Sequence, residues 1–414
     1  MQQQDVLIVG AGPVGLTLAN ALAQAGFRAT VLELQEGAAL AQPAPDGREI
    51  ALTHPSRALL QQLGQWPLLA AHEVGLLRQA QVHDGPVGVH APMHLHAGGT
   101  GLDNLGWIVP NHALRRTAWA LAQTQPAIRL LTGARVTAVQ ISRTQATLHY
   151  SQDGCTATPL QAPLLVAADS RFSAVRQMLG VGADRLDFGR SVIVCRMQHA
   201  QPHHEVTHEC FDWDSTLAIL PLPDDPRSGA HLCSAVVTAR SDQAQALQTL
   251  APQAYAERVA AQFQQRLGAM QLIGQRYSYP LVATWAERFA GLRWALVGDA
   301  AVGTHPVTAH GFNMGLSGVQ TLVATLVQAR QRGLDIGDAR SLARYDRAHR
   351  LHAWPLYAGT NAIVRLYTDA RPLPRLLRRA VLTGSEHLPP LKAAIVSQLT
   401  GRAPAWPKAV LPSL

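Results

Sequence analysis

The residues best placed to do chemistry begin ten positions into the chain, in a glycine-rich turn. An apolar run at residues 6–9 meets the sequence GAGPVG at 10–15, and leucine and alanine then recur at helical spacing as far as Gly26. A second apolar run at 29–32 ends at Glu33. A strand, a GxGxxG turn, a helix and a second strand within about 30 residues form the unit that binds a dinucleotide.

Each part of this turn has a predicted task. Gly10 permits the sharp turn, Gly12 and Pro13 at the helix start let the backbone approach a pyrophosphate, and Gly15 lets helix and strand pack closely. The N-terminus of the helix adds positive potential at the phosphates. Glu33 can accept hydrogen bonds from both hydroxyls of the adenosine ribose, which disfavours a 2′-phosphate there. The motif alone does not separate FAD from NAD.

A second glycine-bearing segment follows the apolar run at 294–297. Gly298-Asp299 stands at the end of that predicted strand, and Gly311-Phe312-Asn313 begins a long apolar helix that reaches residue 329. Asp299 suits a ribityl hydroxyl, and the helix N-terminus suits the negative charge of a reduced flavin ring. This segment therefore favours FAD. It also holds Pro306 and two candidates for proton transfer beside the ring, His305 and His310.

A third segment places Asp169 after the apolar run 164–168. With it, the chain resembles the flavoprotein aromatic hydroxylases typified by p-hydroxybenzoate hydroxylase, whose dinucleotide, "DG" and "GD" motifs all have counterparts. Residues 46–52 and 298–316 are further similar to segments of the ubiquinone-biosynthesis hydroxylases. The resemblance covers roughly residues 5–365, and within that family we favour the branch that hydroxylates 5-demethoxyubiquinol or a neighbouring ring position.

The resemblance implies a fold. We expect an α/β protein with a Rossmann-like FAD-binding domain of the GR2 type, an inserted antiparallel-sheet substrate domain and a helical C-terminal segment. The expected boundaries are residues 1–75, 100–180 and 275–340 for the FAD-binding domain, 76–99 and 181–274 for the substrate domain, and 341–414 for the C-terminal segment. Alternating residues at 191–197, 216–220 and 232–239 favour the strands of the substrate domain.

The resemblance also implies a reaction and further site residues. NAD(P)H reduces FAD, O2 adds to form a flavin C4a-hydroperoxide, and this hydroxylates an electron-rich phenol or quinol ring. Asp169 would serve FAD and the passing NAD(P)H, and Arg48 would bind the pyrophosphate or the flavin. Candidate residues lining the substrate are Leu217, Ile219 and Pro221, although an ordinary place in the sheet core is an equal alternative.

Three departures from the family pattern stand out. The glycine of the DG motif is Ser170, the family's G-Q-G reads Ala309-His310-Gly311, and the usual aspartate after the last motif is Gly318. The serine leaves the nicotinamide contact open, and the histidine adds an imidazole near the expected flavin edge. None of them removes a group that the oxygen chemistry needs.

Composition limits the partners and the location. Of 414 residues, 47% are apolar, and the net charge is +8, with no basic run interleaved with aromatics that would indicate nucleic acid. No signal peptide or long apolar span is evident, and the four cysteines show no CxxC pairing, so we expect buried thiols and a cytoplasmic protein, or one peripheral on the inner membrane face. Histidines at 90–96 and 203–208 match no strong metal template, so no metal is expected.

The C-terminal part suggests a surface function. Arg371, Arg375, Arg378 and Arg379 interleave with leucines, as in an amphipathic helix lying on anionic lipid. The alternatives are a helix packed on its own domain and docking to other proteins of ubiquinone biosynthesis. A lipid contact suits a polyprenyl phenol or quinol substrate.

Three other functions stay open from the sequence. The same flavin motifs would serve a hydroxylase of a soluble phenol, an FAD-dependent reductase of prenyl double bonds that inserts no oxygen, or a flavin-binding partner without turnover. Consumption of O2 together with NADH or NADPH would separate a hydroxylase from a reductase.

Overall fold

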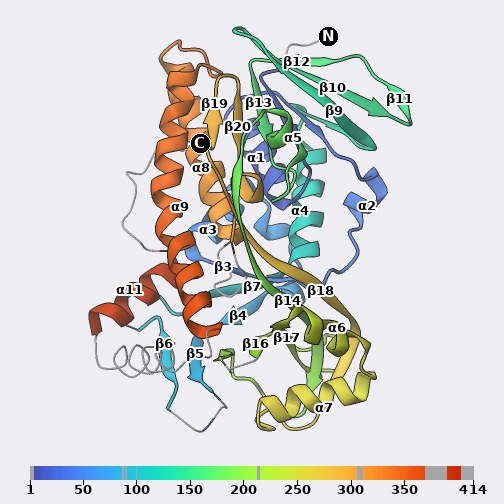
Figure 1. The fold of residues 1–414 in the computed structure, drawn as a ribbon, viewed down its shortest axis with the longest axis vertical. Coiled ribbons are helices and arrows are strands. Elements are labelled where there is room, and N and C mark those ends of the chain that lie inside the picture. The colour runs from blue at the N-terminus through green and yellow to red at the C-terminus, as the bar shows by residue number, and fades with distance from the viewer. Residues whose placement is uncertain are drawn as a thin grey trace.

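The computed structural model describes residues 4–85, 88, 91–98, 100–211, 215–304, 311–368 and 389–401, and it places two main sheets at opposite ends of the molecule (Figure 1). The upper sheet has six strands in the order β19-β20-β13-β1-β2-β8. Its strands are β1 (Val6–Val9), β2 (Ala29–Leu32), β8 (Ile128–Leu131), β13 (Leu164–Ala167), β19 (Ala290–Gly291) and β20 (Trp294–Leu296). All pairs are parallel except β19–β20.

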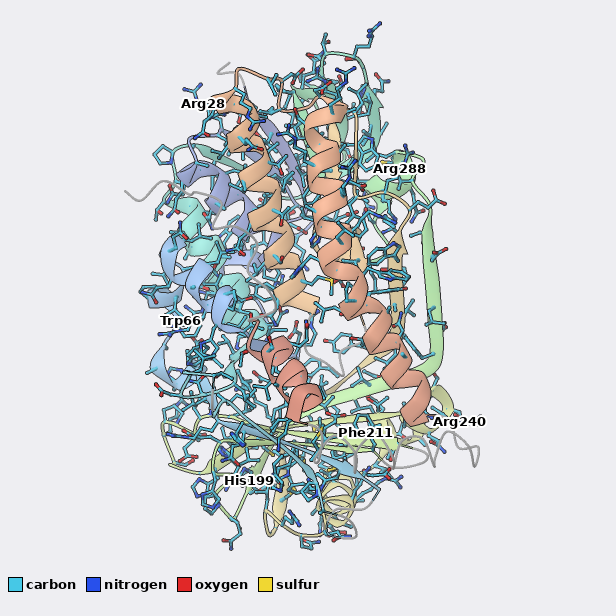
Figure 2. All side chains as sticks on the ribbon, turned by 90° about the vertical axis from the view of Figure 1, so that its left-hand side faces the viewer. Arg28, Trp66, His199, Phe211, Arg240 and Arg288 are labelled. Atoms are coloured by element: carbon cyan, nitrogen blue, oxygen red, sulfur yellow. The ribbon has the colours of Figure 1, made fainter. Side chains whose placement is uncertain are left out.

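The strands of the upper sheet are short apolar runs with helices packed around them. Every residue of β1, β2 and β13 is buried, as expected for a parallel sheet covered on both faces. Helix α1 (Pro13–Gln24) packs against α4 (Asn111–Gln123) and α8 (Gly311–Gln331), and α9 (Ala339–Thr368) lies alongside α8 (Figure 2). The strands expected at 6–9 and 29–32 are confirmed without any shift.

Smaller elements surround this unit. A second, four-stranded sheet comprises β9 (Ala134–Ile141), β10 (Ala146–Gln152), β11 (Cys155–Thr156) and β12 (Leu160–Ala162), and a third comprises β3 (Glu49–Leu52), β7 (Gly106–Pro110) and β4 (Gly75–Leu77). The remaining helices used below are α2 (Gly37–Ala41), α3 (His54–Leu63), α5 (Ala174–Met178), α6 (Ser241–Thr249), α7 (Pro252–Gln262), α11 (Pro389–Thr400) and the 3-10 turn η3 (Gly298–Ala300).

The lower sheet has eight strands in the order β21-β18-β14-β17-β16-β15-β5-β6. They are β5 (Gln79–Asp84), β6 (Met93–His96), β14 (Ala183–His199), β15 (Val206–Phe211), β16 (Ser215–Pro221), β17 (His231–Arg240), β18 (Met270–Ala286) and β21 (Val302–Gly303). Every pair is antiparallel except β15–β5, so the expected antiparallel sheet is confirmed. The expected boundary at 274/275 falls inside β18, and the division into domains stays a prediction.

The two faces of the lower sheet have different neighbours, because successive side chains of a strand point to opposite sides. The outer face packs on α6 and α7 in one apolar cluster that includes Cys195, Leu217, Val237 and Tyr255. The inner face turns toward the upper unit. Its residues include Val192, Val194, Arg196, Glu209, Phe211, Thr216, Ala218, Ser234, Val236 and Thr238, which follow from the strand register.

Two expectations need comment. Leu217 and Ile219 have no exposed surface and belong to the outer cluster, so the structure supports the alternative of an ordinary core position, and Pro221 is buried at the end of β16. Cys195, Cys210 and Cys233 are buried as expected, but Cys155 is exposed on the short edge strand β11, so that part of the expectation is wrong.

Nothing in the described ranges forms a helix long and apolar enough to cross a membrane.

Candidate functional site

The glycine turn between β1 and α1 combines crowded positions with an open one. Gly10 has φ +108°, and a Cβ there would lie 2.5 Å from the Ala168 carbonyl oxygen. A Cβ at Gly15 would lie 2.0 Å from the Gly10 carbonyl oxygen. Because such contacts do not occur between real atoms, both positions require glycine in this fold.

Gly12, in contrast, has nothing within 4 Å of an added Cβ. Its backbone is extended, with φ −66° and ψ 172°, and no side chain caps the helix that begins at Pro13. The first turn of α1 also carries no acidic residue. A helix N-terminus with uncapped N–H groups and open space in front of it is a cradle for an anion.

Glu33 stands at the edge of this cradle, just beyond the end of β2. Its Oε2 accepts a hydrogen bond of 2.7 Å from the Ala11 backbone N–H, and its Oε1 accepts one of 3.0 Å from Gln35. Each carboxylate oxygen can accept a second hydrogen bond. The side chain is therefore held in place and can still receive the hydroxyls of a sugar.

The second glycine segment lies directly against the first. A Cβ at Gly298 would lie 3.2 Å from the Val14 side chain, and one at Gly315 would lie 2.8 Å from it. Gly298 also has φ +59°, which favours glycine. The structure thus brings together two motifs that are far apart in the sequence, and a single extended ligand can touch both.

Asp299, within η3, carries the carboxylate of the second motif. It accepts hydrogen bonds from Arg171 Nε at 3.2 Å and Nη2 at 3.0 Å, and 39% of its side chain is exposed. Arg176 is buried and donates to the carbonyl oxygens of Ala300, at 2.8 Å, and Arg171, at 3.1 Å. Both arginines therefore fasten the third motif to the second.

Asp169 begins that third motif, immediately after β13. Its Oδ2 accepts a long hydrogen bond of 3.4 Å from the Val175 N–H. Its Oδ1 is buried and finds no hydrogen-bond partner among the residues that the structure describes. Since buried polar atoms normally have partners, this oxygen indicates a donor supplied by a ligand or by water.

The start of α8 is tied to β3 by one side chain. Asn313 Oδ1 accepts from the Thr53 N–H at 3.0 Å, and its Nδ2 donates to the Ala51 carbonyl oxygen at 2.8 Å. Gly311 and Phe312 precede it in the first turn of α8, both half-buried. Three predicted site residues of the same segment, His305, Pro306 and His310, lie outside the described residues.

Asn313→Ala should destabilise the protein, because the Thr53 N–H and the Ala51 carbonyl would both lose their partner. A loss of about 2 kcal/mol in the free energy of unfolding is expected, measured by urea titration. Gln320→Ala, at an exposed position of the same helix, is the control and should change little. Equal stability of the two variants would contradict the bridging role of Asn313.

Comparison with known proteins identifies this arrangement of motifs. Residues 3–360 match the family described as FAD binding domain. The chain belongs to this family. It is 42% identical to ubiquinone hydroxylase UbiM of Neisseria meningitidis, over 96% of this chain and 84% of that protein, and 35% identical to ubiquinone hydroxylase UbiL of Rhodospirillum rubrum, over 98% and 91%.

A solved structure shows the same fold. The crystal structure of p-nitrophenol 4-monooxygenase PnpA from Pseudomonas putida matches with a TM-score of 0.76 at 19% identity, covering 97% of this chain and 99% of that one. The predicted fold class, the resemblance to flavoprotein aromatic hydroxylases, the FAD cofactor and the class of FAD-dependent monooxygenase are thereby confirmed.

The described residues fit FAD. An uncapped helix N-terminus beside an open glycine suits the pyrophosphate, the fixed Glu33 suits the ribose, and the orphaned Asp169 oxygen offers an acceptor. Asp299 lies where the second motif meets the first. These individual contacts remain predictions, since each rests on the shape and chemistry of the residues alone.

Arg48, a predicted FAD-binding residue, forms an ion pair with a neighbouring side chain, Asp46. Its guanidinium donates to Asp46 Oδ2 from Nη2 at 2.6 Å, lies 5.5 Å from the centre of the Tyr279 ring and is half-exposed. Although burial favours the neutral acid, the charge of Arg48 and hydrogen bonds from Arg48 and Asn111 lower the pKa of Asp46. To bind FAD, the Arg48 guanidinium would have to contact the cofactor while it stays bonded to Asp46.

Sequence reasoning missed the inner face of the lower sheet. Arg196 of β14 donates to Oε1 of Glu49 at 2.9 Å, and the Glu49 side chain is 1% exposed. Burial raises the pKa of Glu49 to about 7, against the opposing effect of Arg196. The alternating pattern of β16 could have indicated this face. It predicts that Leu217 and Ile219 share one face of the strand and that Ala218 lies on the other, which is the inner face.

Gly318 stands where the family usually has an aspartate, and a histidine side chain lies directly beside it. A Cβ at this position would lie 2.8 Å from Nε2 of His349, a fully buried residue of α9. Burial lowers the pKa of His349 to about 3, so the ring is neutral. The neutral imidazole of His349 thus fills the space next to Gly318, and the sequence did not predict this contact.

Within the described part of the chain, no group of three or more His, Cys, Asp or Glu side chains could hold a metal ion. The arginine-rich segment with Arg371, Arg375, Arg378 and Arg379 lies outside the described residues.

Proposed function

We propose that the protein is an FAD-dependent monooxygenase that hydroxylates the aromatic ring of a polyprenylated ubiquinone precursor, with O2 and with NAD(P)H or another electron donor. The observation that carries the proposal is the similarity, over nearly the whole chain, to two relatives named ubiquinone hydroxylase. The FAD-binding geometry supports it. Hydroxylation of a soluble phenol is the second candidate, because the PnpA-like fold serves such a substrate in that protein.

In this proposal the chain's residues bind and orient the cofactor. The N–H groups at the start of α1 hold the pyrophosphate in the open space in front of Gly12. The Glu33 carboxylate accepts hydrogen bonds from the hydroxyls of the adenosine ribose. Asp299 and Asp169 hold the ribityl end, and the positive end of the α8 dipole, near Gly311 to Asn313, stabilises negative charge on the reduced ring. When bound, FAD supplies electron transfer from the donor and the activation of O2.

The substrate ring would lie between the inner face and the start of α8. Strand β3 joins these two regions, because Asn313 binds its far end and Glu49 binds Arg196 of the inner face. The inner face offers small and apolar side chains such as Ala218, Val194 and Val236. These exclude water from the reacting ring, which is the condition for delivering oxygen to the substrate.

Location and partners complete the proposal. We place the protein in the cytoplasm, peripheral on the inner membrane face, where the arginine-rich segment after residue 370 would contact anionic lipid or other proteins of ubiquinone biosynthesis. The ring position stays a prediction, with 5-demethoxyubiquinol or a neighbouring position favoured. A polyprenyl substrate that resides in the bilayer would make such a contact useful.

Quinone profiling tests the substrate. Cells without this protein should accumulate one polyprenyl ring that lacks a single hydroxyl or its methylated product, and the wild-type gene should restore ubiquinone. A gene carrying Gly12→Val should not. Growth under ¹⁸O2 should place the label on the restored oxygen, and a quinone profile that does not change on deletion would rule out the proposed substrate.

A further inference from the structure

Helix α9 carries two opposed rows of side chains. The inward row, which includes Leu342, Tyr345, His349 and Ala353, is buried on the side that packs against α8 and β19. The positions on the other side of the helix recur at spacings of three and four residues, and all but one of them are exposed. They are residues 340, 344, 347, 351, 354, 358 and 362, here called the outward row. Figure 2 shows α9 next to α8 at the front of the molecule.

The second half of the outward row is apolar. Leu351 is 65% exposed, more than any other large apolar side chain in the described chain, and Trp354 is 54% exposed. Ala358 and Ala362 continue the row, and Pro355 is exposed beside it. Single exposed apolar residues are ordinary. Several of them aligned along about 17 Å of one helix indicate a binding surface.

Trp354 is held in place although more than half of its side chain is exposed. Its ring lies 5.2 Å from the Trp285 ring, edge to face, and 6.1 Å from the Tyr357 ring. The side chain is therefore ordered by its aromatic neighbours and still presents an indole to the outside. Tryptophan is enriched where water meets the apolar layer of a membrane, because its ring is apolar and its N–H is polar.

The first half of the outward row is basic. Arg340, Arg344 and Arg347 are exposed at successive positions of the row, and Arg344 donates to Gln328 Oε1 at 2.9 Å. Among the described residues, no carboxylate pairs with any of these three guanidinium groups. The sequence of α9 has five arginines and a single acidic residue, Asp346, which accepts a hydrogen bond of 2.6 Å from a backbone N–H just before β19. The positive charge of the row is thus available to an anionic partner.

The two halves lie beside different parts of the molecule. In Figure 1, α9 begins next to the upper sheet and ends near α11 and the lower sheet. Arg28 and Arg288, both exposed and labelled in Figure 2, lie at the upper end of the same side, so the basic half belongs to a wider positive region. The apolar half lies nearer to the lower sheet, over whose inner face the substrate ring would bind.

The charge of the outward row selects among partners. In a symmetric dimer the same surface of both copies meets, and this surface would bring three arginines of each copy into a contact that offers them no free carboxylate. An anionic bilayer offers phosphates to the guanidinium groups and an apolar layer to Leu351 and Trp354. Arginine side chains are long enough to reach the headgroups while the helix lies flat on the surface.

We propose that the outward row of α9 docks the protein on an anionic lipid bilayer. Leu351 and Trp354 enter the headgroup region, and Arg340, Arg344 and Arg347 contact lipid phosphates. The use of this contact rests on the proposed function: it brings the lower sheet close to a bilayer that holds a polyprenyl substrate. The contact itself is measured without any turnover.

Sedimentation with lipid vesicles tests the docking. The full-length protein loaded with FAD should bind vesicles of phosphatidylglycerol and phosphatidylcholine in equal amounts, and binding should weaken as salt is added. Vesicles of phosphatidylcholine alone should bind it much less. Arg340→Gln, Arg344→Gln and Arg347→Gln combined should weaken binding to the mixed vesicles by about 100-fold, since each arginine near such a surface contributes about fivefold. Leu351→Gln should weaken it by about fivefold.

Matched controls remove the same groups from other surfaces. Arg129→Gln, Arg135→Gln and Arg258→Gln combined change the net charge equally, at exposed positions of β8, β9 and α7. Met178→Gln removes an exposed apolar side chain from α5. Both control proteins should bind the mixed vesicles within about twofold of the wild type. All variants should keep the wild-type Tm and flavin content, because the substituted side chains are exposed and lie outside the FAD site.

A fluorescent label tests whether the row itself enters the bilayer. In a Cys155→Ser background, which removes the exposed native thiol, Leu351→Cys carries a dye whose emission shifts to shorter wavelength in an apolar environment. Mixed vesicles should shift this emission and leave that of the same dye on Met178→Cys unchanged. This readout separates docking through α9 from vesicle binding through the arginine-rich segment after residue 370.

Three results would overturn the inference. The triple arginine variant and Leu351→Gln would bind mixed vesicles as the wild type does, the dye at residue 351 would show no shift, or the wild type would be a dimer in sedimentation velocity that Leu351→Gln converts to a monomer. The last result would assign the row to a second copy of the chain, and a wild type that ignores every vesicle would leave an acidic protein as the partner and equally overturn the inference.

Activity distinguishes this inference from the proposed function. With a precursor of two isoprene units added in solution, the triple arginine variant should keep the wild-type kcat. With a long-chain precursor held in mixed vesicles, its KM should rise by at least about tenfold. A wild type that docks on vesicles but hydroxylates neither precursor would overturn the proposed function and leave the docking surface intact.

Discussion

Gly12→Val is expected to yield a folded, colourless protein without hydroxylase activity. The position tolerates a side chain in the protein itself, because nothing lies within 4 Å of an added Cβ and the extended backbone suits valine. The added isopropyl group would fill the space in front of α1. Two charge-assisted hydrogen bonds from N–H groups to the pyrophosphate would be lost, each of about 1.5–3 kcal/mol, so FAD affinity should fall by about 10²- to 10⁴-fold.

The measurement is the ratio of flavin to protein absorbance after purification, followed by titration with FAD. Gly359→Val is the matched control: this glycine of α9 also has open space around it, and the variant should keep its flavin. A yellow, active Gly12→Val protein would show that the pyrophosphate binds elsewhere.

Gly15→Val should behave differently from Gly12→Val. Its Cβ would lie 2.0 Å from the Gly10 carbonyl oxygen, so the turn itself would be displaced and the protein should not fold stably. Circular dichroism distinguishes the two variants. The contrast matters because loss of FAD alone does not separate a damaged cofactor site from a damaged fold.

The FAD-binding motifs could be predicted from sequence because their demands are local. A turn that needs φ +108° at Gly10 and close packing at Gly15 leaves few alternatives, and Glu33 follows directly from the end of β2. The buried parallel strands are equally predictable from sequence, since β1 and β2 are short and almost entirely apolar runs. What the motifs could not tell is which partners each side chain has in the folded chain.

The residues on the lower sheet could not be assigned from sequence alone. A strand pattern fixes which residues share a face but not which face meets the cofactor, and a shift by one position exchanges the two sets. In β16 the larger apolar residues Leu217 and Ile219 pack on α6 and α7, and the smaller Ala218 faces inward.

The ion pair of Asp299 with Arg171 is another non-local feature. Because of it, Asp299 could serve the fold through Arg171 or bind FAD directly, and the two roles need separate tests. Arg171 also donates to the Val282 carbonyl oxygen, so it is held in place without Asp299. Both side chains of the ion pair are partly exposed, and such a pair adds at most about 1 kcal/mol to stability. The carboxylate is therefore better explained by a ligand than by the fold.

Asp299→Ala should consequently lower FAD affinity by about 10- to 100-fold, the loss of one charge-assisted hydrogen bond to a ribityl hydroxyl, while the apoprotein keeps its unfolding midpoint. Asp299→Asn keeps an acceptor oxygen and should lose less than about tenfold. The holoprotein Tm of Asp299→Ala should fall with the weaker binding, since the stabilisation by a ligand grows with the logarithm of the ratio of its free concentration to its Kd.

Arg171→Met decides between the two explanations of Asp299. If the carboxylate served only to pair with Arg171, removing either partner would weaken FAD binding equally. If Asp299 holds the ribityl chain, Arg171→Met should free the carboxylate and leave FAD affinity within about threefold of the wild type, as measured by the same flavin titration. Equal losses in the two variants would mean that the ion pair, and not the carboxylate, maintains the site, and the ribityl contact would then have to come from another residue such as Asp169, whose buried Oδ1 has no partner in the described chain.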